Sequence, residues 1–219
     1  MTRALAAFDL IHSDMWGLSP ITTFSGYRYY VTFIDDYTRC TWVYLLHRKS
    51  EVFSTFVRFL QMIKTQFRTI VRNIRSDTGG EYISNEFCSY LNQTGILQQL
   101  PCPRTFEQKS VIERKNRHIM SIVRDLLRDM GVPKSYWHMV VLTTVYVINR
   151  TLSFVLYDRT LFHILIPTTT LLPLLPHVFG CTCFVQNRSL TRVKLNDKSI
   201  RCIFFGYSSI SKGPVCFQR

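Results

Sequence analysis

Three acidic residues stand where they could act together on one substrate. Asp14 closes the expected strand FDLIHSD, Asp77 closes the stretch TIVRNIRSD, and Glu113 opens a long helix after 35 further residues, 78–112. Strand ends and an adjoining helix can converge on one edge of a sheet, and carboxylate oxygens are the ligands that Mg²⁺ prefers. Two divalent ions about 3.5–4 Å apart stabilise the attacking and leaving oxygens of a phosphodiester. The pattern is therefore compatible with metal-dependent chemistry on nucleic acid.

Each of these acids also has an ordinary structural interpretation. Asp14 could form a turn after its strand, and Asp77 could form an Asx turn before two glycines. Glu113 could be stabilised by the helix dipole or pair with Arg117 one turn later. Four other acids compete as ligands: Asp9, Asp35, Asp36 and Glu81.

Three of the competing acids and one histidine have a preferred assignment. We interpret the pair 35–36, at an expected hairpin turn, as structural or supporting, and Glu81 as a weaker alternative ligand to Asp77. His12 lies two residues before Asp14, so the two share one face of a strand. For His12 we favour a structural hydrogen bond over a metal role.

The expected long helix also carries a strongly basic face. The chain has 27 Lys and Arg against 14 Asp and Glu, a net charge of +13, which suggests a polyanionic partner. We expect the following residues to contact nucleic acid: Arg114, Lys115, Arg117, Arg124 and Arg128 on the helix, with Gln108 and Lys109 before it. Such contacts hold phosphates without reading sequence. The alternative is a solvated helix face.

Hydrophobic periodicity predicts a mixed α/β chain. Expected strands are 8–14, 27–35, 40–46, 69–77 and 96–100. Expected helices are one that follows an N-cap at Ser50, then 85–92, 111–130 and 135–149. The pattern predicts a partly antiparallel sheet flanked by helices. Short strand-like runs within 179–218 predict a small β unit.

Four motifs in this order carry a family resemblance. HSDMWG, DDYTR, RSDTGGEY and ERKNRH resemble the integrases of copia-type retrotransposons, densely over 8–152, and FGC and CIFFGYS resemble their tail. The resemblance implies a ribonuclease H-like catalytic core from a Pol polyprotein. It also implies that Asp14, Asp77 and Glu113 hold two Mg²⁺ or Mn²⁺ ions for 3′-end processing and strand transfer. Element ends and target DNA would be the partners of a homo-oligomer, in the nucleus.

One loop departs from the family. The family has Pro-x-Gln-Asn-Gly before the catalytic Glu, whereas residues 106–110 read FEQKS and keep only Gln108. The proline that would fix φ and the glycine that would permit a positive φ are both absent from this loop. We therefore expect a degenerate copy with weak or no strand transfer. Two alternatives remain open: a non-catalytic nucleic-acid-binding remnant, and a ribonuclease H-like nuclease.

The remaining features set broad limits. The run Val140–Ile148 is too short to span a bilayer, and nothing predicts export or membrane insertion. Seven cysteines with no C-x-x-C pair favour reduced thiols in an intracellular protein. We predict a core over 1–152, an eroded connector over 153–178 and a β-rich segment over 179–219.

Overall fold

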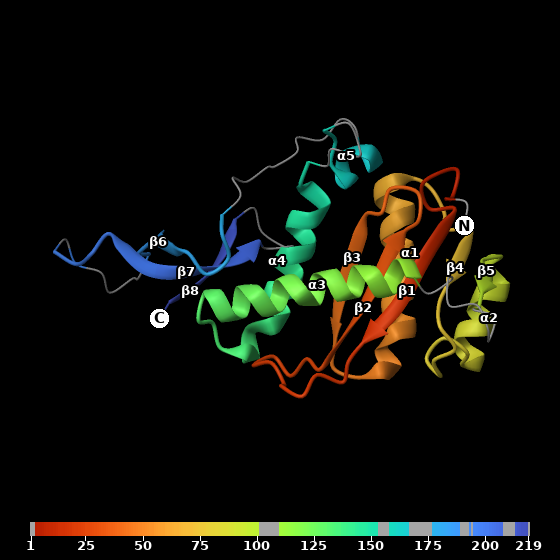
Figure 1. The fold of residues 1–219 in the computed structure, drawn as a ribbon, viewed down its shortest axis with the longest axis horizontal. Helices are drawn as coiled ribbons and strands as arrows, with labels where there is room; N and C mark the ends of the chain where they lie inside the picture. The colour runs from red at the N-terminus through yellow and green to blue at the C-terminus, as the bar shows by residue number, and fades with distance from the viewer. Residues whose placement is uncertain are drawn as a thin grey trace.

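The computed structural model describes residues 3–100, 110–152, 158–166, 177–188, 193, 195–207 and 213–218. The central sheet has five strands in the order β3-β2-β1-β4-β5 (Figure 1). Its strands are β1 (Leu10–Trp16), β2 (Tyr29–Asp35), β3 (Thr41–Leu46), β4 (Asn73–Arg75) and β5 (Leu97–Gln99). The first three form an antiparallel meander, and β4 and β5 run parallel to β1.

Helices cover both faces of this sheet. They are α1 (Val52–Phe67), α2 (Asn85–Thr94), α3 (Ser110–Asp129), α4 (Trp137–Arg150) and the short α5 (Leu161–Leu165). Helices α1 and α2 pack on one face around Phe33, Phe56 and Phe87. Helices α3 and α4 pack on the other face around Tyr30, Ile119 and Val140. The predicted mixed sheet flanked by helices is thus confirmed.

Several predicted boundaries are wrong. Asp14 does not close β1, because pairing with β2 continues to Trp16 opposite Tyr30. The strand predicted at 69–77 is reduced to Asn73–Arg75, and the one predicted at 96–100 is reduced to Leu97–Gln99. Ser50 is not an N-cap, since it lies within a 3₁₀ turn, Lys49–Glu51, that precedes α1.

The ends of α2 follow the sequence pattern closely. The hydroxyl of Ser84 accepts a hydrogen bond from the Phe87 N–H, as an N-cap does. Gly95 ends the helix with φ +70°, a left-handed conformation that glycine adopts without steric cost. The predicted helix at 85–92 is therefore confirmed and extends to Thr94.

Helix α4 protects the edge of the sheet at β3. The Asn149 side chain accepts a hydrogen bond from the Thr41 N–H at 3.0 Å and donates one to the Thr41 carbonyl at 2.7 Å. A side-chain amide thus takes the place of a neighbouring strand on backbone groups that would otherwise be unpaired. This contact joins residues 108 positions apart and fixes α4 against the sheet.

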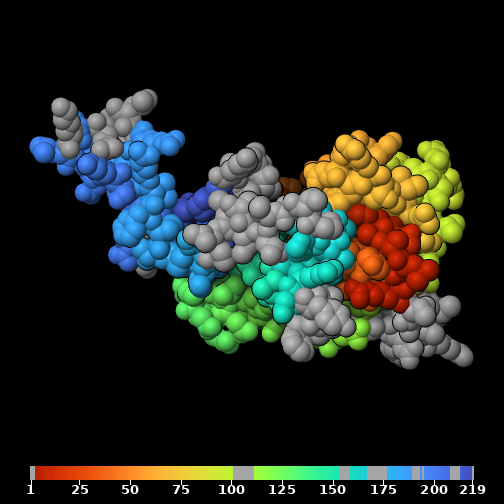
Figure 2. Space-filling view, turned by 90° about the horizontal axis from the view of Figure 1, so that it is seen from above, coloured from red at the N-terminus to blue at the C-terminus, as the bar shows by residue number. Residues whose placement is uncertain are grey.

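The C-terminal residues form a separate sheet that packs beside α4 and extends away from the central sheet (Figures 1 and 2). Its strands are β6 (Thr182–Gln186), β7 (Ser199–Tyr207) and β8 (Pro214–Gln218), all antiparallel. Phe179 and Phe205 join the core between α3 and α4. Gly206, at φ +127°, lies directly against Thr143 of α4, where a side chain would not fit. The predicted small β unit is therefore confirmed.

Candidate active site

Asp14 and Asp77 occupy equivalent places on neighbouring parallel strands. His12 of β1 pairs in register with Arg75 of β4, and each Asp follows two residues later. Asp14 is still inside β1, opposite Thr32 of β2. Asp77 lies in the turn after β4, where its carboxylate accepts a hydrogen bond from the Gly79 N–H at 3.0 Å. Parallel pairing therefore brings the two acids to the same level of the sheet.

Helix α3 brings Glu113 to the same side through a residue that the sequence interpretation missed. Asn116, one helical turn after Glu113, is buried and donates a hydrogen bond from Nδ2 to the Asp14 carboxylate at 2.9 Å. Its Oδ1 accepts a hydrogen bond from the Thr32 hydroxyl at 3.1 Å. The only available signal was spacing, since residues i and i+3 share a helix face.

The electrostatics of Asp14 show that the three acids influence one another. Burial raises the pKa of Asp14, the negative charge of Asp77 raises it further, and Glu113 adds a smaller contribution. The hydrogen bond from Asn116 opposes these effects, and the resulting pKa is about 6. Burial is the main reason that the pKa of Asp14 lies above its usual value of 3.8, and the neighbouring negative charges add to that effect.

Two buried tyrosines adjoin this acidic group. The Tyr82 hydroxyl lies 2.7 Å from the Ser13 hydroxyl, beside Asp14 in β1. Burial raises the pKa of Tyr82, and the charges of Asp14 and Asp77 add to the effect. Burial likewise raises the pKa of Tyr30, with a further contribution from Asp14. Both phenols therefore remain neutral, and neither offsets the negative charge.

A divalent cation suits this group of donors. Carboxylate oxygens are the ligands that hard cations prefer, and the excess negative charge around Asp14 is what a bound cation would neutralise. In the described residues, however, no three His, Cys, Asp or Glu side chains are gathered closely enough to hold a metal ion. The carboxylates therefore interact through space without forming a closed ligand cage.

Sequence comparison finds two known domains in the chain. Residues 5–105 match the integrase core domain, and residues 181–219 match the retroviral polymerase SH3-like domain. The Pol polyprotein of transposon RE1 from Arabidopsis thaliana is 38% identical over 96% of this chain. That of transposon TNT 1-94 from Nicotiana tabacum is 39% identical over 94%. The chain thus contains an integrase core domain and is similar over most of its length to copia-type Pol polyproteins.

The chain is much shorter than these relatives. It spans 14% of the RE1 polyprotein and 15% of the TNT 1-94 polyprotein. Both are described as retrovirus-related Pol polyproteins from transposons. The activities of a whole polyprotein can therefore be assigned to this chain only as a proposal.

Solved structures confirm the fold of the integrase core. A chain of the simian T-cell lymphotropic virus intasome in complex with PP2A regulatory subunit B56 gamma superposes with a TM-score of 0.60 at 16% identity, over 92% of this chain and 71% of that one. The HTLV-2 integrase catalytic core in complex with magnesium gives 0.54 at 17% identity, over 74% and 99%. The predicted ribonuclease H-like fold is confirmed.

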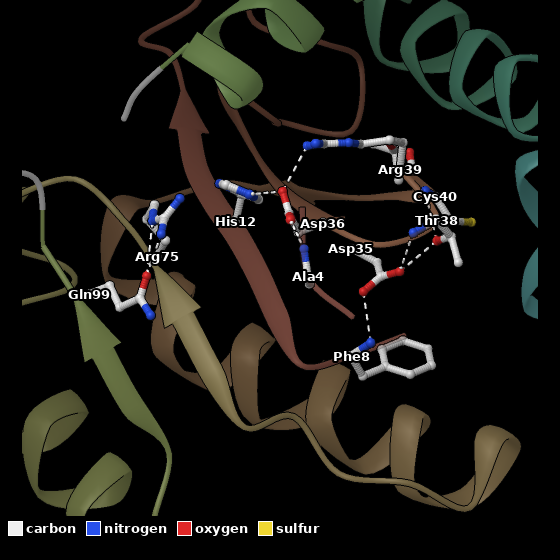
Figure 3. A network of polar contacts seen from close by, with 11 residues as sticks. Ala4, Phe8, His12, Asp35, Asp36, Thr38, Arg39, Cys40, Arg75 and Gln99 are labelled. Atoms are coloured by element: carbon white, nitrogen blue, oxygen red, sulfur yellow. Dashed lines mark hydrogen bonds and ion pairs between the residues drawn. The ribbon is translucent and has the colours of Figure 1, made fainter. Parts of the chain in front are cut away.

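A buried polar network surrounds Asp35 and Asp36 near the β2–β3 turn (Figure 3). Asp36 accepts hydrogen bonds from His12 Nε2 at 2.8 Å and from the Ala4 N–H at 2.7 Å, and Arg39 Nη1 lies 2.9 Å away as an ion pair. Asp35 accepts from the N–H groups of Phe8 and Thr38 and from the Thr38 hydroxyl. The structural interpretation of this acidic pair and of His12 agrees with these contacts.

The candidate nucleic-acid contacts do not all share one surface. Arg114, Arg117, Arg124 and Arg128 are exposed along α3, whereas Lys115 is partly buried. Burial lowers the pKa of Lys115. Gln108, Lys109 and the rest of the loop at 101–109 lie outside the described residues. Glu81 approaches Asp77 across Gly79, so it stays an alternative ligand.

Proposed function

We propose that this chain is the catalytic core of a polynucleotidyl transferase that processes DNA 3′ ends and joins them to target DNA. The proposal assigns Asp14, Asp77 and Glu113 as ligands for two Mg²⁺ or Mn²⁺ ions. The observation that supports it most is the raised pKa of Asp14, because the negative charges of Asp77 and Glu113 add to the effect of burial on this carboxylate. The match to the integrase core domain suggests the reaction class.

The proposed chemistry consists of two displacements at phosphorus. In the first, water attacks a phosphodiester, the P–O3′ bond breaks and a DNA 3′-hydroxyl is released. In the second, that hydroxyl attacks a target phosphodiester, one P–O bond forms and another breaks, and the target 3′-oxygen leaves with the proton. When bound, the ions would activate the nucleophile and neutralise charge on the reacting oxygens.

The chain's own residues position these reactants. Asn116 fixes one oxygen of Asp14 and ties α3 to β1 and β2, so Glu113 is held beside the sheet. The exposed arginines of α3 would bind backbone phosphates and place the scissile group. Because displacement by about 1 Å costs about 100-fold in rate, this fixed geometry matters as much as the ligands.

Three further parts of the proposal rest on the family and on the loop. We propose that the working form is a homo-oligomer, that it acts on nuclear DNA, and that this copy is degenerate. Joining would then be weaker than cleavage, because the loop at 106–110 leads directly into Glu113. The described residues contain no helix long and apolar enough to cross a membrane.

The deciding experiment is nicking of an end-labelled duplex with and without Mg²⁺. We expect metal-dependent nicking that falls at least about 100-fold in Glu113→Gln, because this change removes a proposed metal ligand. Glu81→Gln is the matched control, because it removes a nearby carboxylate that is not assigned as a ligand. Undiminished nicking by Glu113→Gln, or its loss in Glu81→Gln, would refute the assignment.

The same assay separates the alternatives. Nicking without any joining of a processed end would identify a ribonuclease H-like nuclease. DNA binding without metal-dependent nicking would identify a non-catalytic remnant. Joining of a labelled end to a second duplex would support the transferase.

A further inference from the structure

A second charged site lies beside α3, on another face of the helix from Glu113. It is an open pocket of about 420 Å³, here called the basic pocket. Its described lining comprises Ile34 and Arg39 from the β2–β3 region and four residues of α3: Val111, Arg114, Lys115 and His118. None of these six residues is acidic, and four carry basic side chains.

The geometry of the helix separates the basic pocket from the acidic site. At about 100° per residue, Lys115, Val111 and His118 project about 140–200° around the axis from Glu113, and Arg114 projects about 100° from it. Asn116 and Ile119 face the sheet between these two surfaces, and both are buried. The basic pocket is therefore distinct from the site that holds Asp14 and Asp77.

The Asp36 carboxylate orients Arg39 within the basic pocket. The Asp36 carboxylate lies 2.9 Å from Arg39 Nη1, and the same carboxylate accepts hydrogen bonds from His12 and from the Ala4 N–H (Figure 3). Asp36 is thus shared among three donors. It orients the Arg39 guanidinium without neutralising the other cations of the pocket.

Lys115 faces a positive neighbour. Its surroundings include Arg39 and the Cys40 thiol. Burial raises the pKa of Cys40 to about 12, so this thiol is neutral and supplies no counter-charge. No hydrogen bond or ion pair joins the Lys115 ammonium to another of the described residues. A partly buried ammonium without an acidic partner, beside a guanidinium, is unfavourable until an anion arrives.

From these contacts we infer that the basic pocket binds a phosphate group. Guanidinium forks and an ammonium around one cavity match the oxygens of a phosphate, with which they form charge-assisted hydrogen bonds. A phosphodiester of duplex DNA is the favoured source. Arg114 belongs both to the pocket and to the exposed arginine face of α3, so one DNA backbone could follow both. Only this choice of source rests on the proposed function.

A phosphate-binding pocket and a solvated basic face predict different salt dependences of DNA affinity. Log affinity for duplex DNA falls with log salt with a slope of about −0.9 for each phosphate neutralised. If Arg114 and Lys115 hold one phosphate together, Arg114→Gln/Lys115→Met should reduce the magnitude of this negative slope by about one, not by two. Arg117→Gln/Arg124→Gln, two residues spaced along the exposed face, should lower it by up to about two.

A charge-matched control and a folding control complete the DNA arm. Lys198→Gln/Arg201→Gln removes the same charge from exposed residues of the distant β6–β8 region and should leave the slope unchanged. Arg114→Gln alone changes an exposed side chain, so it tests the pocket without endangering the fold. The Tm of each variant shows whether it remains folded.

A second arm uses inorganic phosphate. Titration against chloride at constant ionic strength should shift the NMR signals of the Arg114 and His118 side chains in the unmodified chain but not in Lys115→Met. Phosphate shifts with an unchanged DNA slope would make free phosphate the source. If phosphate causes no shift and the pocket variants leave the slope unchanged or lower it by about two, the inference is overturned. Neither readout needs Glu113, so Glu113→Gln tests the proposed function separately.

Discussion

The acidic site and the basic pocket present opposite imbalances of charge around the first turns of one helix. At the acidic site, three carboxylates interact and the pKa of Asp14 rises to about 6. In the basic pocket, Lys115 lies near Arg39, and the Asp36 carboxylate that pairs with Arg39 forms no ion pair with Lys115. Most buried charges in proteins are paired, so a carboxylate with a raised pKa and an ammonium without an acidic partner among the described residues are better explained by ligands than by stability.

The two sites also differ in how they are supported. A neutral amide, Asn116, holds Asp14 and leaves its charge uncompensated. A charged carboxylate, Asp36, holds Arg39 and draws on His12 as well. His12 and Asp14 lie on the same face of β1, two residues apart, so the Asp36 network adjoins the acidic site as well as holding Arg39. Substitution of Asp36 should therefore reduce the stability of the fold more than substitution of the carboxylates of the acidic site or of the cations of the basic pocket.

The largest expected effect is on stability, from Asp36→Ala. This change leaves a buried histidine, an arginine and a backbone N–H without their acceptor, so the free energy of unfolding should fall by about 3–5 kcal/mol. Asp9→Ala is the control, because its ion pair with Arg72 is 3.5 Å long and exposed, and it should cost less than about 1 kcal/mol. Urea denaturation measures both. Equal losses would show that the network does not stabilise the fold.

The Asp36 network should also determine acid sensitivity. Burial raises the pKa of Asp36, but hydrogen bonds from His12 and Ala4 and the charge of Arg39 overcome that effect and lower it to about 2. A depressed folded-state pKa gives stability that is present above the usual value of 3.8. This stability is lost as pH falls from about 4 to about 2, and Asp36→Ala should lack that part of the transition.

The second-largest expected effect is a gain in stability, from Asp14→Asn. The pKa of Asp14 is raised from 3.8 to about 6, so the folded chain binds the proton more tightly and its stability falls as pH rises through this range. Without metal, Asp14→Asn should therefore stabilise the chain at pH 7 by up to about 3 kcal/mol, and the gain should vanish below about pH 4. Asp125→Asn, on the exposed part of α3, should change little. A loss of stability in Asp14→Asn at pH 7 would contradict a strained acidic site.

Much of the scaffold was predictable, because local patterns determine it. The helical spacing of Phe56, Phe59 and Ile63 predicts α1, and β-branched and aromatic runs predict β2 and β3. Strands β4 and β5 were overestimated, because apolar residues beside them, such as Val71 and Ile96, are buried without taking part in strand pairing. Ser50 failed as a cap because a 3₁₀ turn precedes α1 and changes which residue is its N-cap.

The site was predictable only in part. The motifs named Asp14, Asp77 and Glu113, and their roles stay a prediction that the pKa of Asp14 supports. The division between an exposed arginine face and a pocket around Lys115 depends on how α3 docks on the sheet, which no local pattern encodes. The bridge from Asn116 to Thr32 spans 84 positions and depends on the same docking.

The smallest expected effect tests that bridge. Asn116→Ala removes the donor to Asp14 and the acceptor for the Thr32 hydroxyl, both buried, and should cost about 1–3 kcal/mol. The hydrogen bond from Asn116 lowers the pKa of Asp14, so its loss should move that pKa above about 6. A ¹³C NMR titration of the Asp14 carboxyl reports this directly, which a stability assay alone would not. Thr32→Val, which leaves the Asn116 donor in place, should destabilise the chain with a smaller change in the titration. If Asp14 titrates at the same pH in Asn116→Ala as in the unmodified chain, then Asn116 supports the helix only and does not position the acid.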